Sequence, residues 1–192
     1  MAKNKLTYII VLNYNAYQDT IDCLKSIFYS NSKDYKIVLV DNASTDLSLN
    51  NIQKWILDSA CNNIEILKLD NNGGYSSGNN SGIQYALKKE DCQYIWILNN
   101  DVIVKSDSLE ELKKSDQNSN VQTIWGSKIL YENGQIQSLG CTIDKKFMLT
   151  YHNYNKYKNK DTDYVIDKID YIHGCSIFLN KSIIEKIGFF DE

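Results

Sequence analysis

Apolar and polar residues alternate in a regular way along the first hundred residues of the chain. Four short runs consist almost entirely of apolar residues, which is typical of strands that are buried on both faces. These predicted strands are Leu6–Leu12, Tyr35–Val40, Asn63–Leu69 and Gln93–Leu98. Between them, apolar residues recur every three or four positions, as they do in amphipathic helices. The predicted helices are Tyr17–Tyr29, Thr45–Asp58 and Tyr75–Lys88.

This alternation of strands and helices defines the expected fold class. Parallel strands joined by helices form a sheet that the helices cover on both faces, with right-handed crossovers. We therefore predict an α/β protein, a three-layer α/β/α sandwich with a mostly parallel, doubly wound sheet. Ligands of such sheets bind beyond the carboxyl ends of the strands, so the residues that follow each strand are the most informative about function.

The pattern becomes less regular after Asp101. Shorter elements are predicted here, and a polar, Lys-rich loop interrupts them. In chain order, we expect a helix at Ser108–Lys114, a strand at Val121–Leu130, a turn and strand at Gly134–Gly140, an aromatic segment at Phe147–Tyr154, the loop at Asn155–Asp163, a strand at Tyr171–Leu179 and a helix at Ser182–Ile187 that ends at Gly188.

Polar residues, mostly Asn, Asp and Gly, follow each of the first four predicted strands. The four segments are Asn13–Asn15, Asp41–Asp46, Asp70–Tyr75 and Asn99–Asp101. Any one of them alone is typical of a helix N-cap or an Asx turn. Four in succession at one edge of a sheet indicate a ligand-binding site instead.

Two of these segments suit a ligand that carries a base, a ribose and phosphate. Asp41 closes a strand and can accept hydrogen bonds from a base or ribose, provided that Ser44 or Thr45 is the N-cap of the next helix. Gly73 and Gly74 let the backbone approach a ligand closely, and the helix that begins there offers free N–H groups to phosphate. The spacing matches neither GxGxxG nor GxxxxGK[ST], which excludes the dinucleotide and P-loop motifs.

Charge and composition add a divalent cation to this picture. The formal net charge of −3 argues against a nucleic-acid partner, and an anionic ligand would need a local positive charge. Asp101 lies between the apolar runs Gln93–Leu98 and Val102–Val104, where a hard divalent cation that bridges phosphate oxygens is a suitable partner. Such an ion would stabilise a diphosphate leaving group as a Lewis acid. The alternative is that Asp101 is only a capping residue.

Cysteine usage and hydropathy bear on the cellular compartment. The chain has five cysteines, an odd number without a CxxC pair, which favours unpaired thiols in a reducing compartment. Neither a signal peptide nor a run of 18 apolar residues is visible. We therefore expect a cytoplasmic chain without a transmembrane segment, with a peripheral place at the inner face of the membrane left open.

Five segments in this order resemble family 2 glycosyltransferases of the GT-A fold, close to their bacterial rhamnosyltransferase-like branch. The resemblance extends from about Leu6 to the last residue. The segments are YIIVLNYN at Tyr8–Asn15, IVLVDNASTD at Ile37–Asp46, LDNNGGYSSGNNSGI at Leu69–Ile83, WILNNDV at Trp96–Val102 and YIHGCSIFLNKSIIEKIGFFDE at Tyr171–Glu192.

The resemblance implies roles for individual residues on the donor side. Asn13 and Asp41 would contact the base and ribose of a nucleotide-sugar donor. A turn, with Gly78 and Asn79 behind it, would shape the donor pocket. Its residues are Asn72, Gly73, Gly74 and Tyr75.

The resemblance also implies a metal and an acceptor side. Asn99–Asp101 stands in the place of the DxD motif of the family, so that Asp101 would bind Mn²⁺ or Mg²⁺, while Asn99 replaces the first acid of the motif. Gly174 and Cys175 would form the floor of the acceptor pocket. His173 either touches the substrate or is a hydrogen-bonded structural histidine, and the second role is the more common one.

The general base is the part that the resemblance does not supply. In inverting members of the family, an Asp within a Glu-Asp pair deprotonates the acceptor hydroxyl, and Asp191 and Glu192 come too early in the pattern for this role. We therefore expect the base beyond Glu192 and interpret the chain as truncated at its C-terminus. Residues 1–104 would be the nucleotide-sugar-binding half, and residues 105–192 a partial acceptor-side half.

The resulting prediction is an inverting, metal-assisted glycosyltransferase. It would move a hexose or deoxyhexose from a UDP-, dTDP- or GDP-sugar to a hydroxyl of a glycan or lipid-linked acceptor, in cell-surface polysaccharide biosynthesis. One alternative is a catalytically incomplete fragment that only binds nucleotide or a partner. Another is a nucleotide-sugar pyrophosphorylase, which would have a Gly-rich, basic loop after the first strand, unlike Asn13–Gln18.

Overall fold

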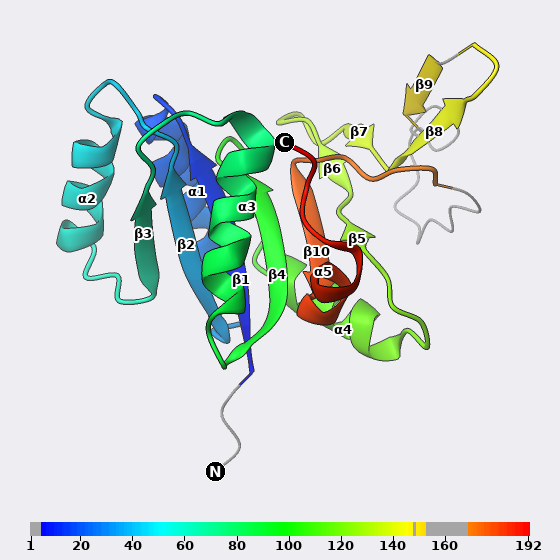
Figure 1. Ribbon diagram of the computed structural model, residues 1–192, viewed down its shortest axis with the longest axis horizontal. Coiled ribbons are helices and arrows are strands. Elements are labelled where there is room, and N and C mark those ends of the chain that lie inside the picture. Colours follow the sequence, from blue (N-terminus) through cyan, green and yellow to red (C-terminus); the bar gives the residue numbers. More distant parts are fainter. Residues whose placement is uncertain (1–4, 148, 153–168) are drawn as a thin grey trace.

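A six-stranded sheet forms the centre of the computed structural model, which describes residues 5–147, 149–152 and 169–192 (Figure 1). The strand order is β3-β2-β1-β4-β10-β5. Strands β3, β2, β1 and β4 are parallel, whereas β10 is antiparallel to β4 and to β5. The strands are β1 (Leu6–Asn13), β2 (Tyr35–Asp41), β3 (Ile64–Lys68), β4 (Cys92–Asn99), β5 (Trp125–Gly126) and β10 (Ser176–Asn180).

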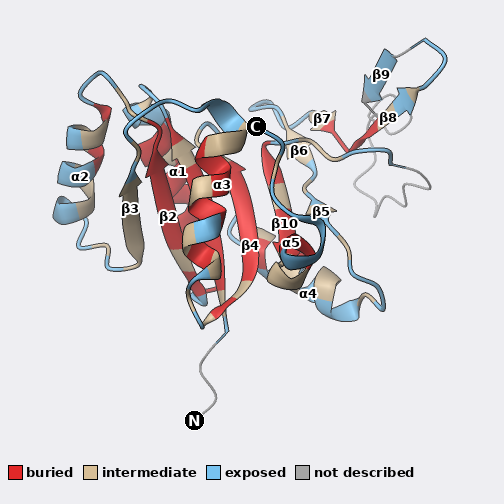
Figure 2. Ribbon diagram, viewed as in Figure 1, coloured by how far each residue is buried: buried red, intermediate tan, exposed pale blue. Residues whose placement is uncertain are grey.

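Helices cover both faces of this sheet. On one face, α1 (Tyr17–Phe28), α2 (Ser48–Asp58) and α4 (Ser108–Asn118) share a core with the sheet. On the other face, α3 (Gly74–Leu87) and α5 (Lys181–Ile187) do so. Figure 2 shows that the central strands β1, β2 and β4 are the most deeply buried layer. The predicted three-layer α/β/α sandwich is confirmed.

Strand β1 shows why its continuous apolar run belongs inside the sandwich. Successive side chains of a strand point to opposite faces. Ile9 and Val11 pack into the core under α1, α2 and α4, whereas Tyr8 and Ile10 pack into the core under α3 and α5. All four are completely buried, so the side chains of this stretch fill the cores on both faces of the sheet.

Helix α3 packs against the sheet through two glycines that face it. A Cβ on Gly78 would lie 2.5 Å from Leu12 Cδ1, and a Cβ on Gly82 would lie 2.5 Å from Ile10 Cγ2. Side chains at these positions would push the helix away. Because Gly78 and Gly82 have no side chains, the N-terminus of α3 can lie next to the carboxyl ends of β1 and β2.

The loop before α2 differs from the prediction, since the helix begins at Ser48 and not at Thr45. Asn15 Oδ1 accepts hydrogen bonds from the backbone N–H groups of Thr45 (2.8 Å) and Asp46 (3.3 Å). Asp46 Oδ1 in turn accepts the N–H of Ser48 at 2.8 Å. The expectation that Ser44 or Thr45 caps this helix is therefore wrong, because Asn15 holds their loop outside it.

The region between α4 and β10 consists of shorter strands than predicted. Within the predicted strand Val121–Leu130, β5 pairs with β10, whereas β6 (Ile129–Leu130) pairs with β7 (Ile136–Ser138) in a separate hairpin. A further hairpin of β8 (Cys141–Asp144) and β9 (Leu149–His152) projects from the body of the molecule (Figure 1). The predicted loop Asn155–Asp163 lies outside the described residues.

The last predicted strand also begins later than expected. Tyr171 forms an isolated bridge to Cys141 instead of joining the main sheet, and the chain turns before β10 starts at Ser176. Gly174 and Cys175 therefore lie in a loop beside the end of β4, where the Asn99 N–H donates to the Cys175 carbonyl at 3.0 Å. Among the described residues, no helix is long and apolar enough to span a membrane.

Candidate functional site

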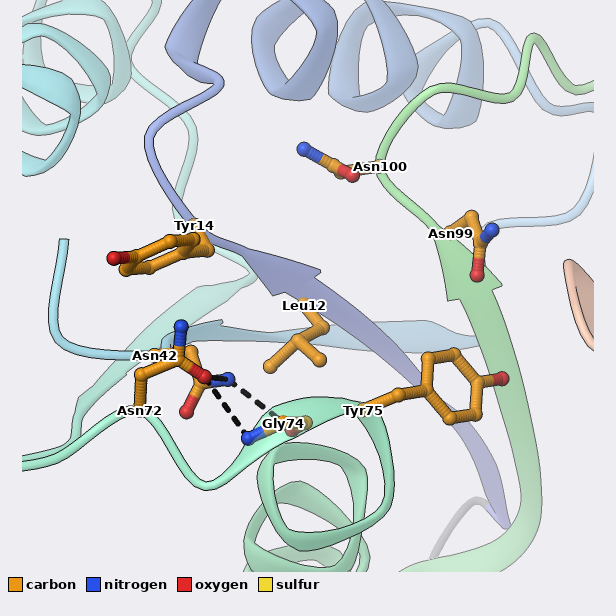
Figure 3. Close-up of a pocket in the computed structure, with 8 residues that line it drawn as sticks. All are labelled: Leu12, Tyr14, Asn42, Asn72, Gly74, Tyr75, Asn99 and Asn100. Atoms are coloured by element: carbon orange, nitrogen blue, oxygen red, sulfur yellow. Dashed lines mark hydrogen bonds between the residues drawn. The ribbon is translucent and has the colours of Figure 1, made fainter.

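A cleft of about 320 Å³ opens at the carboxyl ends of β1, β2 and β4, beside the start of α3 (Figure 3). This volume falls within the range of small-molecule sites, about 300–1,000 Å³. The lining consists mainly of amide and tyrosine side chains and carries no charged group. Its residues are Leu12, Tyr14, Asn42, Asn72, Gly74, Tyr75, Asn99 and Asn100.

Asn13 and Asp41 lie behind this lining and are almost completely buried, with exposed fractions of 0% and 1%. Asn13 Nδ2 donates to Asp41 Oδ1 at 2.8 Å and to Ser44 Oγ at 3.0 Å. Ser44 donates to Asp41 twice, from Oγ to Oδ1 (2.6 Å) and from its backbone N–H to Oδ2 (3.2 Å). The expectation that Asp41 is left free by a helix-capping Ser44 is wrong, because Ser44 binds Asp41 itself.

The same hydrogen-bond network continues to the end of β4. Thr20, on α1, donates from Oγ1 to Asn13 Oδ1 at 2.8 Å, and Asn100 Nδ2 donates to Thr20 Oγ1 at 2.9 Å. Thr20 and Asn100 are 80 positions apart in sequence, so local patterns could not connect them. The result is one continuous polar network under the cleft, which joins the ends of β4, β1 and β2.

Asn42, directly after Asp41, holds the glycine turn at the start of α3 and was not predicted as a site residue. Its side chain is 2% exposed. Asn42 Nδ2 donates to Asn72 Oδ1 at 2.8 Å and to the Gly74 carbonyl at 3.1 Å, while Asn42 Oδ1 accepts the Gly73 N–H at 3.3 Å. Asn42 follows β2 within the motif IVLVDNASTD, so its place at the strand end was a usable signal.

The glycine turn differs from the expected phosphate cradle in one respect. The Gly74 N–H donates to Asn72 Oδ1 at 2.9 Å, and the Gly73 N–H is bound to Asn42. The expectation of free N–H groups is therefore wrong for these two residues. Gly74 has φ 77°, a conformation that favours glycine, and the positive end of the α3 dipole still faces the cleft.

Tyr75 separates the cleft from the loop that contains Gly174 and Cys175. Its hydroxyl donates to the Gly174 carbonyl at 2.6 Å, and burial raises the pKa of Tyr75 to about 12. The backbone N–H of Cys175 donates to His173 Nδ1 at 3.4 Å, as in the structural role considered for this histidine. The structure thus brings the predicted donor residue Tyr75 together with the two predicted acceptor-side residues.

Asn79 supports the site from behind and does not line the cleft. It is completely buried, and its Nδ2 donates to the Tyr75 carbonyl at 2.9 Å. Among the described residues, Asn79 Oδ1 has no hydrogen-bond partner. Gly78 and Asn79 therefore lie behind the turn, where the resemblance places them.

Asp101 is exposed at the end of β4, next to the cleft residues Asn99 and Asn100. Burial, and secondly the negative charge of Asp101, raise the pKa of Cys23 to about 12 and that of Cys175 to about 11. The end of β4 lies next to both α1 and the loop before β10, since Cys23 Sγ donates to the Asn99 carbonyl at 3.6 Å and the Asn99 N–H donates to the Cys175 carbonyl at 3.0 Å. Within the described ranges, no three His, Cys, Asp or Glu side chains cluster closely enough to hold a metal ion by themselves.

Comparison with known protein families identifies the class of this protein. The family model of glycosyl transferase family 2 matches residues 8–188, nearly the whole chain. The chain therefore belongs to glycosyl transferase family 2. The predicted family is confirmed, whereas its rhamnosyltransferase-like branch stays a prediction.

Individual relatives agree with this assignment. The chain is 26% identical over 186 residues to the low-salt glycan biosynthesis hexosyltransferase Agl10 of Haloferax volcanii, covering 96% of the chain and 55% of the relative. It is 27% identical over 129 residues to the glycosyltransferase GlyG of Streptococcus pneumoniae, covering 67% of the chain and 41% of the relative. The chain thus spans about half the length of the curated relatives that it matches.

A solved structure supports the fold. The mannosyltransferase PcManGT from Pyrobaculum calidifontis, in complex with GDP-Man and Mn²⁺, superposes with a TM-score of 0.67 at 15% identity, covering 99% of this chain and 48% of that one. At this identity the likeness concerns the fold alone, and it confirms the predicted GT-A fold.

Proposed function

We propose that this chain forms the donor site of a glycosyltransferase that uses a nucleoside-diphosphate sugar. The observation that carries the proposal is the convergence of three strand ends and the α3 turn on one uncharged, amide-rich cleft. Amide groups can donate to and accept from a base, a ribose and sugar hydroxyls. The solved mannosyltransferase that shares the fold holds GDP-Man, which supports a donor of this class.

A divalent cation, Mn²⁺ or Mg²⁺, fits the site as a partner of Asp101. Mg²⁺ is often bound by one or two protein carboxylates together with substrate phosphates, so a single exposed carboxylate suffices for such an arrangement. The cation would neutralise the charge that develops on the diphosphate leaving group. Asp101, at the end of β4, is the residue that we propose to hold it, and Asn99 and Asn100 would present amide groups beside it.

The remaining residues of the site would bind and orient the donor. Asn13 and Asp41 give the nucleoside side of the cleft a fixed arrangement of donors and acceptors, since they are bound to one another and to Ser44. Tyr75 and the Gly174–Cys175 loop would separate the donor from the acceptor side. A hydroxyl of a glycan or lipid-linked molecule is the proposed acceptor, with inversion at the sugar carbon.

We assign the general base to no residue of this chain. Glu192 Oε1 accepts a hydrogen bond from Asn80 Nδ2 on α3 at 2.9 Å, which occupies that carboxylate with a structural contact. Donor binding without transfer is therefore a second candidate function for this chain. Single-turnover transfer assays on glycan and lipid-linked acceptors separate the two candidates, since only the first produces a transferred sugar.

Thermal unfolding in the presence of UDP-, dTDP- and GDP-sugars, with and without Mn²⁺, tests the donor site. A ligand at about 100 times its Kd stabilises the folded protein by about 2.7 kcal/mol. We expect one class of nucleotide to raise the melting temperature, and Mn²⁺ to increase that shift. If none of the three nucleotides raises it under either condition, the proposal is wrong.

A further inference from the structure

Thr20 is completely buried on α1 and does not line the cleft, yet it connects two groups that belong to the site. Its Oγ1 lies 2.8 Å from Asn13 Oδ1 on one side and accepts from Asn100 Nδ2 at 2.9 Å on the other. Asn13 belongs to the nucleoside side of the proposed site, and Asn100 lies next to Asp101. Thr20 is therefore placed between the two sides.

The hydrogen bonds to Asp41 determine how the groups in this network are oriented. Asp41 Oδ1 accepts from Asn13 Nδ2, so Asn13 turns its NH₂ group toward Asp41 and its oxygen away from it. Among the described residues, Thr20 is the only donor to that oxygen. The Thr20 hydroxyl therefore donates to Asn13, and its lone pairs are left to receive Asn100 Nδ2.

A second acceptor near Thr20 does not alter this order. The carbonyl oxygen of Ala16 also lies 2.8 Å from Thr20 Oγ1, and a hydroxyl has only one proton to donate. The Ala16 carbonyl already accepts the backbone N–H of Thr20 at 3.1 Å, whereas a buried Asn13 oxygen without a donor would be costly. The proton is thus needed at Asn13. The donors then run in one direction, from Asn100 through Thr20 and Asn13 to Asp41.

We propose that Thr20 is a positioning residue of the donor site. Its hydroxyl fixes the amide of Asn100 to the same unit as Asn13 and Asp41, so the nucleoside side and the metal side are held in one geometry before a ligand arrives. Chains of hydrogen bonds that point the same way also strengthen one another. This inference rests on the proposed function, since it concerns the geometry of the same cleft.

Three substitutions separate a positioning role from a merely structural one. Thr20→Val keeps the shape of the side chain and removes the hydroxyl, whereas Thr20→Ser keeps the hydroxyl and removes a buried methyl group. Thr7→Val is the matched control, because Thr7 is also completely buried but its Oγ1 has no partner among the described residues. Thr7 lies near the start of β1, at the end away from the cleft.

Calorimetric titration with UDP, dTDP and GDP, each with Mn²⁺, gives the expected split between affinity and stability. We expect Thr20→Val to weaken nucleotide binding about 3- to 10-fold, the range for one buried hydrogen bond. Thr20→Ser should bind within about twofold of the wild type despite a lower melting temperature, because it keeps the hydroxyl and loses only packing. Thr7→Val should leave nucleotide binding unchanged and should raise stability only slightly, if at all. Equal binding by wild type and Thr20→Val, or equal weakening in Thr20→Ser, overturns the inference.

A ligand-free measurement distinguishes failure of this inference from failure of the proposed function. In NMR spectra, hydrogen exchange of the Asn100 side-chain NH₂ should be faster in Thr20→Val than in the wild type and unchanged in Thr7→Val. If the wild type binds no nucleotide but the exchange result holds, the proposed function fails and Thr20 still positions Asn100. Unchanged exchange in Thr20→Val shows that Thr20 positions nothing.

Discussion

The two carboxylates at the ligand edge of the sheet, Asp41 and Asp101, have opposite environments. Asp41 is 1% exposed and accepts hydrogen bonds from Asn13 and Ser44, whereas Asp101 is exposed at the end of β4. A buried carboxylate is stable only when donors replace the water that it has lost. The comparison indicates that Asp41 helps to build the site, while Asp101 is available to what binds there.

The contrast between Asp41 and Asp101 gives the largest expected effect. Asp41→Asn replaces one of the two acceptor oxygens by an NH₂ group, which then faces either the Ser44 N–H or the donors Asn13 Nδ2 and Ser44 Oγ. We therefore expect the free energy of unfolding to fall by about 2–4 kcal/mol. Asp101→Asn should change stability little, because the side chain is solvated. Urea unfolding of both variants measures the difference, and equal losses would show that the two carboxylates play the same role.

Substitution of two glycines of α3 should distinguish contacts with the core from contacts with the cleft. A Cβ on Gly82 would meet Ile10 Cγ2 at 2.5 Å and Val40 Cγ2 at 2.9 Å, both on β-branched side chains of the core. We expect Gly82→Ala to lower the free energy of unfolding by about 1–3 kcal/mol. Gly78→Ala should cost less, because the terminal methyl groups of Leu12 can turn away.

The cost of Gly78→Ala should appear in binding instead. Leu12 lines the cleft, so the displaced methyl groups would occupy space that a ligand needs. Chemical denaturation and nucleotide titration of both alanine variants check this split. A larger loss of stability in Gly78→Ala than in Gly82→Ala would contradict it.

Tyr75→Phe tests the contact between the cleft and the acceptor-side loop. The variant removes the hydrogen bond to the Gly174 carbonyl and keeps the ring. We expect a loss of about 1 kcal/mol in the free energy of unfolding, typical of one hydrogen bond. Urea denaturation measures it, and the accompanying result should be faster hydrogen exchange near Cys175. Unchanged exchange there would show that the hydroxyl does not hold the loop.

The smallest expected effect concerns the alkaline range. The pKa of Cys175 is raised from its ordinary value of 9.0 to about 11, first by burial and then by the charge of Asp101. A raised folded-state pKa favours the protonated thiol, so its contribution to stability is complete below about pH 9 and is lost as the pH rises through about 11. Cys175→Ala should therefore lose less stability than the wild type between pH 8.5 and about 11.

Unfolding curves at several pH values measure this difference. Cys23 and Cys92 also have raised pKa values, each about 12, and titrate in both proteins, so only the difference between the proteins is informative. Parallel pH profiles for Cys175→Ala and the wild type would contradict the assignment. Asp101→Asn should lower the pKa of Cys175 slightly, since the Asp101 carboxylate is the second cause of its raised pKa.

The first hundred residues predict the fold well because the local pattern and the tertiary environment agree there. A run such as YIIVL in β1 can be buried on both faces only in the middle of a covered parallel sheet. The predicted element boundaries are wrong where a side chain that is distant in sequence binds the backbone. The start of α2 moved to Ser48 because Asn15, which is 30 positions before Thr45, binds the backbone of the preceding loop.

The sequence alone could locate the candidate site, but it could not predict the hydrogen bonds that link the residues of the site. Polar residues after each strand identified the edge of the sheet, and the cleft indeed opens there. The hydrogen bonds between these residues depend on how the strands and helices pack against one another, which no local sequence pattern predicts. Thr20 joins Asn13 to Asn100 only because α1 packs on the face of the sheet next to the ends of the neighbouring strands β1 and β4. The prediction of the strands after Asp101 failed for a related reason, because their lengths depend on which strands they pair with. Strand β5 pairs with β10, β6 with β7, and β8 with β9.

The Mn²⁺ dependence of nucleotide affinity is the decisive test of the proposed donor site with a metal at Asp101. The wild type, Asp101→Asn and the control Asp70→Asn are titrated with UDP, dTDP and GDP, with and without Mn²⁺. Asp70 is a suitable control because it is exposed after β3 at the same edge. We expect Mn²⁺ to tighten binding to the wild type and to Asp70→Asn, but not to Asp101→Asn. The same Mn²⁺ dependence in Asp101→Asn as in the wild type would contradict it.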